Sequence, residues 1–185
     1  NDIFLNFKIE NFKDIPFMDK DTLRISRKFL LRPDYTKKIQ YCYTNGSTGG
    51  RVSVAYDQES MDWSSAVMLF CRNLYGHNLI NKEVHLATDS RSRGKQIERL
   101  GQFSKELANN RSNIFIKDFN KESIFDYLKQ LRFQRTNLLH GMPSQINGLI
   151  SDSVDKFKIP LIETSGEFLR GEQRCNIEEF FSARV

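Results

Sequence analysis

The sequence predicts an α+β fold that is mainly α, with a short strand-rich N-terminal part followed by an antiparallel helical bundle. In residues 39–57 apolar side chains alternate with polar ones, which is typical of half-buried strands. From Ser60 onward apolar residues recur every three or four positions, which is the helical period. With 185 residues and 39% hydrophobic side chains, the chain can bury a core. We expect a strand-rich part at 1–58 and a helical domain at 59–185.

The N-terminal part contains several expected strands. Residues 2–12 alternate apolar and polar side chains, and residues 22–31 form a weaker strand or a short helix. Residues 39–44 and 51–57 alternate more clearly, and the Gly-rich segment 45–50 between them predicts a hairpin turn.

The helical part is expected to contain successive amphipathic helices. The apolar spacing predicts helices at 60–76, about 90–109, 120–143, 144–157, 161–169 and 177–181, with a short extended link at 114–119. Gly141 and then Pro143 predict the end of the helix at 120–143, and Pro160 ends or kinks the helix after it.

The helix at 120–143 carries a charged residue where its apolar face needs a hydrophobic one. Arg135 lies four residues after Leu131 and three before Leu138, and a guanidinium cannot be buried there without acceptors. His140, whose side-chain type titrates near neutral pH, follows five residues later. This stretch therefore brings a permanent cation and a titratable ring within two turns.

The segment from Arg135 to His140 resembles the signature of the HEPN superfamily, in which an Arg is followed four to six residues later by a His. The family most often has Asn where this chain has Thr136, and here Asn137 comes one place later. The resemblance covers about 59–185 and implies a helical bundle that cleaves RNA without a metal. It implies a toxin or phage-defence endoribonuclease that leaves a cyclic phosphate.

The residues themselves suggest matching roles. His140 would act as general acid or base, and Arg135 would stabilise charge on the phosphoryl oxygens. Asn137 or Thr136 would orient the imidazole or hold a phosphate oxygen. Positions five apart on a helix point about 140° away from each other, so one chain would struggle to bring Arg135 and His140 together. A two-fold homodimer would let each His approach the other chain's Arg.

The basic residues are concentrated next to this helix. Between Lys82 and Arg135 there are twelve Lys/Arg and seven Asp/Glu, an excess that equals the net charge of +5. This distribution is typical of a phosphate-backbone partner, although an ordinary solvated helix surface looks the same. The expected RNA-binding residues are Arg91, Arg93, Lys95, Arg99, Lys129 and Arg132.

Two other functions remain open. Residues 91–159 also resemble the DNA-gripping helical domain of tyrosine recombinases, which would make the chain a non-catalytic nucleic-acid-binding module. Alternatively, the chain is a HEPN-like scaffold that only dimerises or binds a partner. In these readings Arg135 pairs with a carboxylate and His140 caps a helix. His77 is then expected as a cap, and His85 as a surface or packing residue.

The cysteines, the spacing of possible metal ligands and the length of the apolar runs indicate the compartment, the cofactors and the membrane contacts to expect. Three widely spaced cysteines without a C-x-x-C pair suggest reduced thiols and a cytoplasmic protein. No His/Cys cluster has the spacing of zinc ligands, so we expect no metal and no other cofactor. No apolar run approaches membrane-spanning length, and we expect no membrane partner. An antitoxin or regulatory partner is a further expectation for a nuclease of this kind.

Overall fold

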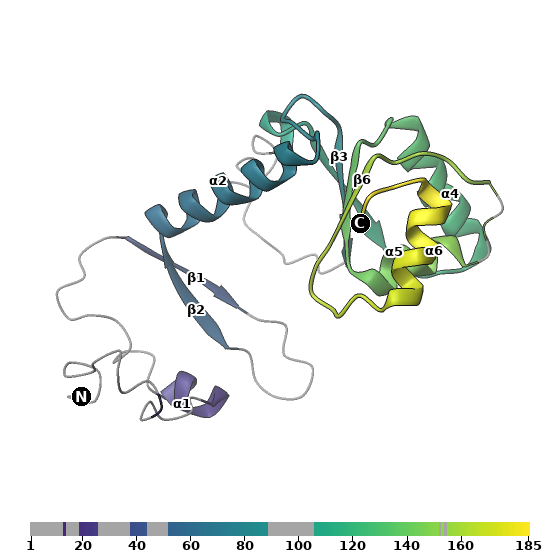
Figure 1. Cartoon of the computed structure of the whole chain (residues 1–185). Helices are drawn as coiled ribbons and strands as arrows, with labels where there is room; N and C mark the ends of the chain where they lie inside the picture. Colours follow the sequence, from purple (N-terminus) through teal and green to yellow (C-terminus); the bar gives the residue numbers. More distant parts are fainter. Residues whose placement is uncertain are drawn as a thin grey trace. The chain divides into compact units, whose positions relative to one another are not determined.

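The computed structural model describes residues 13, 19–25, 38–43, 52–88, 106–151, 153 and 155–185 (Figure 1). These residues form a mixed α/β protein that divides into two compact units, 1–68 and 69–185. Within the described residues, no helix is long and apolar enough to cross a membrane.

The first unit contains the predicted hairpin. β1 (Ile39–Tyr43) and β2 (Ser53–Asp57) are antiparallel, with Ile39 opposite Asp57, which confirms the hairpin expected from the alternating pattern. A short helix, α1 (Lys20–Ile25), precedes it. α2 (Gln58–Leu74) follows β2 directly, because the Asp57 carboxylate accepts the backbone N–H of Ser60 and so caps the helix. The last residues of α2, 69–74, belong to the second unit. The strand expected at 2–12 and the turn at 45–50 lie outside the described residues.

The second unit is built on a four-stranded parallel sheet. Its strands are β3 (Glu83–Thr88), β4 (Arg111–Ile116), β5 (Leu138–Gly141) and β6 (Leu161–Thr164), in the spatial order β4-β3-β5-β6. Three further helices are α4 (Lys121–Phe133), α5 (Pro143–Ile150) and α6 (Gly171–Phe181). Figure 1 shows these three helices gathered beside the sheet.

This sheet overturns the predicted fold class, because the second unit is not an antiparallel helical bundle. The helix predicted at 120–143 stops at Phe133 and continues as strand β5, and the helix predicted at 161–169 begins as strand β6. The expected link at 114–119 begins inside β4. A buried parallel strand is a short apolar run, and helical periodicity cannot distinguish such a run from a buried turn of helix.

α4 ends just before Arg135, the charged residue that interrupts the apolar face of the helix predicted at 120–143. Arg135 has a left-handed backbone with φ +52°, and its N–H donates to the carbonyl of Arg132. The N–H of Thr136 then donates to the carbonyl of Leu131. These two bonds form a Schellman motif, which ends a helix and is usually built on glycine. Arg135 therefore ends the helix in place of Gly141, which lies in β5 against Leu86.

The core lies between one face of the sheet and the three helices. Alternate residues of every strand point to this face, among them Val84 and Leu139, which are fully buried. The helices contribute buried apolar side chains to the same cluster, including Leu131, Leu149 and Phe181. The strand residues that alternate with these core residues therefore point to the opposite face of the sheet.

Candidate active site

The second face of the sheet carries a row of polar side chains. Parallel sheets are normally buried and apolar on both faces, so polar residues in mid-strand are unusual. The strand register places Asn113, His85, His140 and Glu163 side by side across β4, β3, β5 and β6. Because side chains alternate along a strand, these four point away from the core that their neighbours form.

Four side chains on this face form one chain of hydrogen bonds. The Oγ atom of Ser165, directly after β6, lies 2.8 Å from Nε2 of His140. The Nδ1 atoms of His140 and His85 are 3.3 Å apart, and the rings meet edge to face. Nε2 of His85 bonds the carboxylate of Glu83 two residues earlier in β3. We call this series, from Ser165 through His140 and His85 to Glu83, the relay.

The carboxylate at one end fixes the direction of every hydrogen bond in the relay. Glu83 can only accept, so His85 donates its Nε2–H to it and, when neutral, has a free lone pair on Nδ1. His140 then donates its Nδ1–H to His85 and keeps a lone pair on Nε2. The Ser165 hydroxyl donates to that lone pair. With both rings neutral, His140 therefore presents a base to Ser165.

The same relay reverses when it gains one proton. A proton bound at Nε2 of His140 allows its Nδ1–H to pass to Nδ1 of His85, which becomes a cation beside Glu83. His140 then presents an N–H in place of a lone pair. A single imidazole can thus act first as a base and then as an acid at the same position.

A buried arginine holds the carboxylate end of the relay. Nη1 of Arg72, near the end of α2, lies 3.1 Å from Glu83, and Nη2 lies 2.5 Å from Glu163. The side chains of Arg72 and Glu83 are only 5% and 6% exposed, whereas Glu163 is 35% exposed. Such a buried guanidinium fixes both carboxylates by charge-assisted bonds.

These contacts shift the titration of the groups. Burial lowers the pKa of His140, and the positive charge that His85 carries when protonated lowers it further, so the His140 ring is mainly neutral at pH 7. Burial alone would raise the pKa of Glu83, but the hydrogen bond from His85 and the charge of Arg72 outweigh burial, and the pKa is lowered. Glu83 is therefore ionised and His140 is a free base at neutral pH.

The order of the strands places the relay at a favourable point of the sheet. The chain passes from β3 to β4 on one side and then to β5 on the other side of β3. In open α/β sheets, ligands bind at the carboxyl ends of strands where the order reverses in this way. His85 and His140 come from β3 and β5, and Ser165 follows the carboxyl end of β6.

Among the residues predicted as catalytic, the structure places only His140 in the relay. Arg135 ends α4 and is exposed, and the buried Thr136 hydroxyl donates to the carbonyl of Leu131. Asn137 accepts a hydrogen bond from Nδ1 of His77, and the other ring nitrogen of that buried His lies 3.9 Å from Glu83. Asn137 thus borders the cluster without touching His140.

Of the predicted nucleic-acid-binding residues, Lys129 and Arg132 lie on the outer surface of α4. The inner surface of that helix packs on the apolar face of the sheet, so both cations are on the side opposite the relay. Arg91, Arg93, Lys95 and Arg99 lie outside the described residues.

Most of the relay is not predictable from the sequence patterns. They favour a surface or packing role for His85, and they assign no role to Ser165 or Arg72. One signal was available in β3, where Glu83 and His85 are two residues apart and interrupt the apolar run of a strand on one face only.

The described residues contain no group of three or more His, Cys, Asp or Glu side chains arranged to hold a metal ion. Comparison with models of known protein families gives no match, and comparison with curated proteins gives none either.

Proposed function

We propose that the second unit is a hydrolase in which Ser165 attacks an ester and His140 serves as its base. The observation that carries this proposal is the 2.8 Å contact between the exposed Ser165 hydroxyl and the lone pair of a neutral imidazole. A nucleophile within hydrogen-bond reach of a base, with a third group orienting that base, is the diagnostic arrangement of nucleophilic catalysis. Here His85 and Glu83 supply the orientation.

The reaction follows the two states of the relay. Ser165 Oγ bonds to the ester carbonyl carbon while its proton moves to Nε2 of His140, and the positive charge is stabilised next to Glu83. His140 then returns that proton to the leaving alcohol as the ester bond breaks. Water, deprotonated by the same nitrogen, then bonds to the acyl carbon, and His140 returns that proton to Ser165 Oγ as the bond from Oγ to the acyl group breaks and the acid leaves. The backbone N–H of Gly166, directly after the nucleophile, is in the sequence position from which an oxyanion is often stabilised.

Labelling with a fluorophosphonate probe tests this proposal, because such probes react with activated serines. Intact mass and peptide mapping are expected to show one adduct on Ser165, and no adduct in the Ser165→Ala or His140→Gln variants. Ser151→Ala is the matched control, since Ser151 is also exposed but its hydroxyl donates to the carbonyl of Asn147 and bonds no imidazole among the described residues. No adduct on Ser165 in the wild-type protein would reject the nucleophile.

A second candidate is the metal-independent endoribonuclease. The same imidazole that contacts Ser165 could take the proton of a ribose 2′-hydroxyl and later protonate the leaving 5′-oxygen. The net charge of +5 is in keeping with an RNA substrate. In this reaction the nucleophile belongs to the RNA, so cleavage in EDTA should survive Ser165→Ala and be lost in His140→Gln. Loss of cleavage in Ser165→Ala would contradict a reaction in which the 2′-hydroxyl of the RNA is the nucleophile.

The proposed relay is complete within one chain, so neither reaction requires the homodimeric site. A homodimer and a regulatory partner stay predictions. The cysteines Cys42, Cys71 and Cys175 are free and exposed, which favours a reducing compartment such as the cytoplasm for the working protein.

A further inference from the structure

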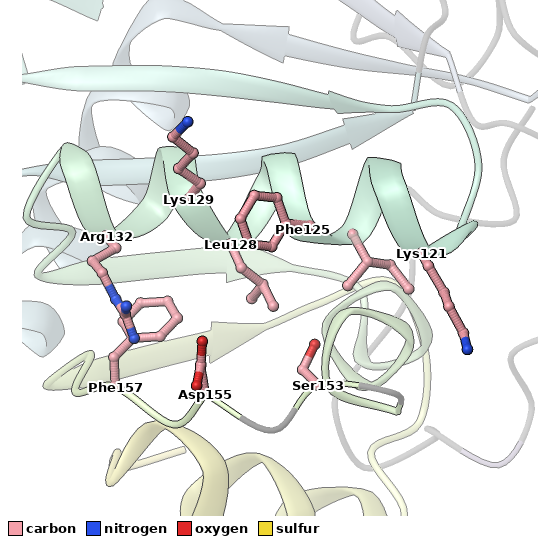
Figure 2. Close-up of a pocket in the computed structure, with 9 residues that line it drawn as sticks. Lys121, Phe125, Leu128, Lys129, Arg132, Ser153, Asp155 and Phe157 are labelled. Atoms are coloured by element: carbon pink, nitrogen blue, oxygen red, sulfur yellow. The ribbon is translucent and has the colours of Figure 1, made fainter.

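A groove runs along one flank of α4, on the face of the sheet that the helices cover. It has a volume of about 460 Å³ and lies between α4 and the side chains of Ser153, Asp155 and Phe157 (Figure 2). Lys121, Phe125, Leu128 and Arg132 share one helical face at steps of four, three and four, and together they form one wall. We call this feature the α4 groove.

The α4 groove is positively charged. Lys121, Lys129 and Arg132 border it, and among the described residues that line it Asp155 is the one carboxylate. None of the three cations forms an ion pair within the part of the chain that the structure describes. Figure 2 shows Lys121 and Arg132 at opposite ends, both extending toward the wall that carries Asp155. Their charges remain available to an anionic ligand that follows the length of the groove.

The α4 groove also presents aromatic rings. Phe125 is 64% exposed in the middle of the wall, so its ring is accessible to a ligand in the groove. Phe157 is held from behind by Phe181, with ring centroids 5.4 Å apart. The guanidinium of Arg132 lies 5.0 Å from the Phe157 ring centre, so this planar cation is already oriented before any ligand binds (Figure 2).

We propose that the α4 groove binds single-stranded nucleic acid. Alternating cations and exposed aromatic faces are the combination that such binding uses, since phosphates contact the cations and unpaired bases stack on the rings. A duplex buries its base faces and could not use Phe125. An acidic peptide would use the cations but has no flat rings to stack on Phe125. The site is separate from the relay, because α4 lies across the apolar face of the sheet.

Fluorescence anisotropy with a labelled twelve-nucleotide single strand tests the proposal. Phe125→Ala is expected to raise Kd about five- to hundredfold, which is the range of one lost stacking contact. Lys121→Ala and Arg132→Ala should each weaken binding and reduce the slope of log K against log salt by about 0.7. A duplex of the same length should bind more weakly than the strand.

The matched controls are Lys117→Ala and Arg170→Ala, which remove exposed cations that do not line the groove. His140→Gln should leave Kd unchanged, which separates this proposal from the proposed catalysis. Equal losses in the groove and control variants, or no effect of Phe125→Ala, would mean general charge attraction and would overturn the proposal. Tighter binding of an acidic peptide than of the single strand would also overturn it.

Discussion

The two faces of the parallel sheet differ sharply, and neighbouring residues of β5 show the contrast. Leu139 points into the core and is fully buried among apolar side chains from the strands and helices. His140, the next residue, points the opposite way and bonds Ser165 and His85. One step along the chain thus separates a residue that stabilises the fold from one that is available for chemistry.

The two faces also differ in the free energy of burying their side chains. On the apolar face, burial itself is favourable, and no hydrogen bond has to be kept. On the polar face, Arg72 and Glu83 are buried ions whose desolvation must be offset by their mutual contacts. Buried ion pairs of this kind contribute little net stability, so we interpret the polar face as one whose side chains have a chemical role.

The largest expected effect is on catalysis at the polar face. His140→Gln should lower hydrolysis of a chromogenic ester by at least about 10²–10⁴-fold, because the base and the later acid are both lost. The melting temperature should change little, since the ring is partly exposed. Calorimetry and initial rates on the same preparation check both statements. A folded variant with full activity would contradict the role of His140.

Removing the buried cation should cost the most stability. Arg72→Met leaves Glu83 buried without its partner, and we expect a loss of about 3–5 kcal/mol in the free energy of unfolding. Urea denaturation measures this loss. The control is Arg174→Ala, which breaks an exposed pair with Glu178 and should cost no more than about 0.5 kcal/mol. Similar losses in both variants would contradict the account of Arg72.

On the apolar face, Leu139→Ala should lower the free energy of unfolding by about 2–5 kcal/mol through the cavity that it creates. Ester hydrolysis per folded molecule should remain close to that of the wild-type protein, because His140 keeps its partners. Urea denaturation and rates measured well below the transition test the two faces separately. A Leu139→Ala protein with the free energy of unfolding of the wild type would contradict the stabilising role of the apolar face.

The smallest expected effect concerns Arg135. Its left-handed backbone is unfavourable for any residue except glycine, so Arg135→Gly should raise the free energy of unfolding by up to about 1 kcal/mol. The same variant should keep its ester hydrolysis, since the side chain lies at the end of α4. Loss of activity in a folded Arg135→Gly variant would restore this residue to the catalytic site.

The sequence predicted some elements well because their patterns are local. The hairpin at β1 and β2 follows from alternation around a Gly-rich turn, and α2 follows from helical spacing, whereas the spacing predicts only residues 177–181 of α6. The parallel strands were missed because the run from Leu138 to Gly141 is four residues long and apolar on both sides of His140. A pattern of that length carries no period of its own.

The candidate site was only partly predictable for a related reason. His140 was recognised by its chemistry, but its partners are 55 residues away at His85 and 25 residues away at Ser165. Only the register of β3 against β5 brings the two histidines together, and that register depends on the whole sheet. Arg135 seemed functional because a helix was assumed to pass through it, whereas the helix ends there.

The proton positions in the relay test the central claim most directly. Long-range nitrogen–proton NMR of the ¹⁵N-labelled protein at pH 7.5 should show neutral His140 with its proton on Nδ1, and a proton on the Nε2 atom of His85 that faces Glu83. On acidification His140 should titrate below the usual value of about 6.5, because burial and neighbouring His85 lower its pKa. A proton on Nε2 of His140 at pH 7.5, or titration above the usual value, would contradict the account.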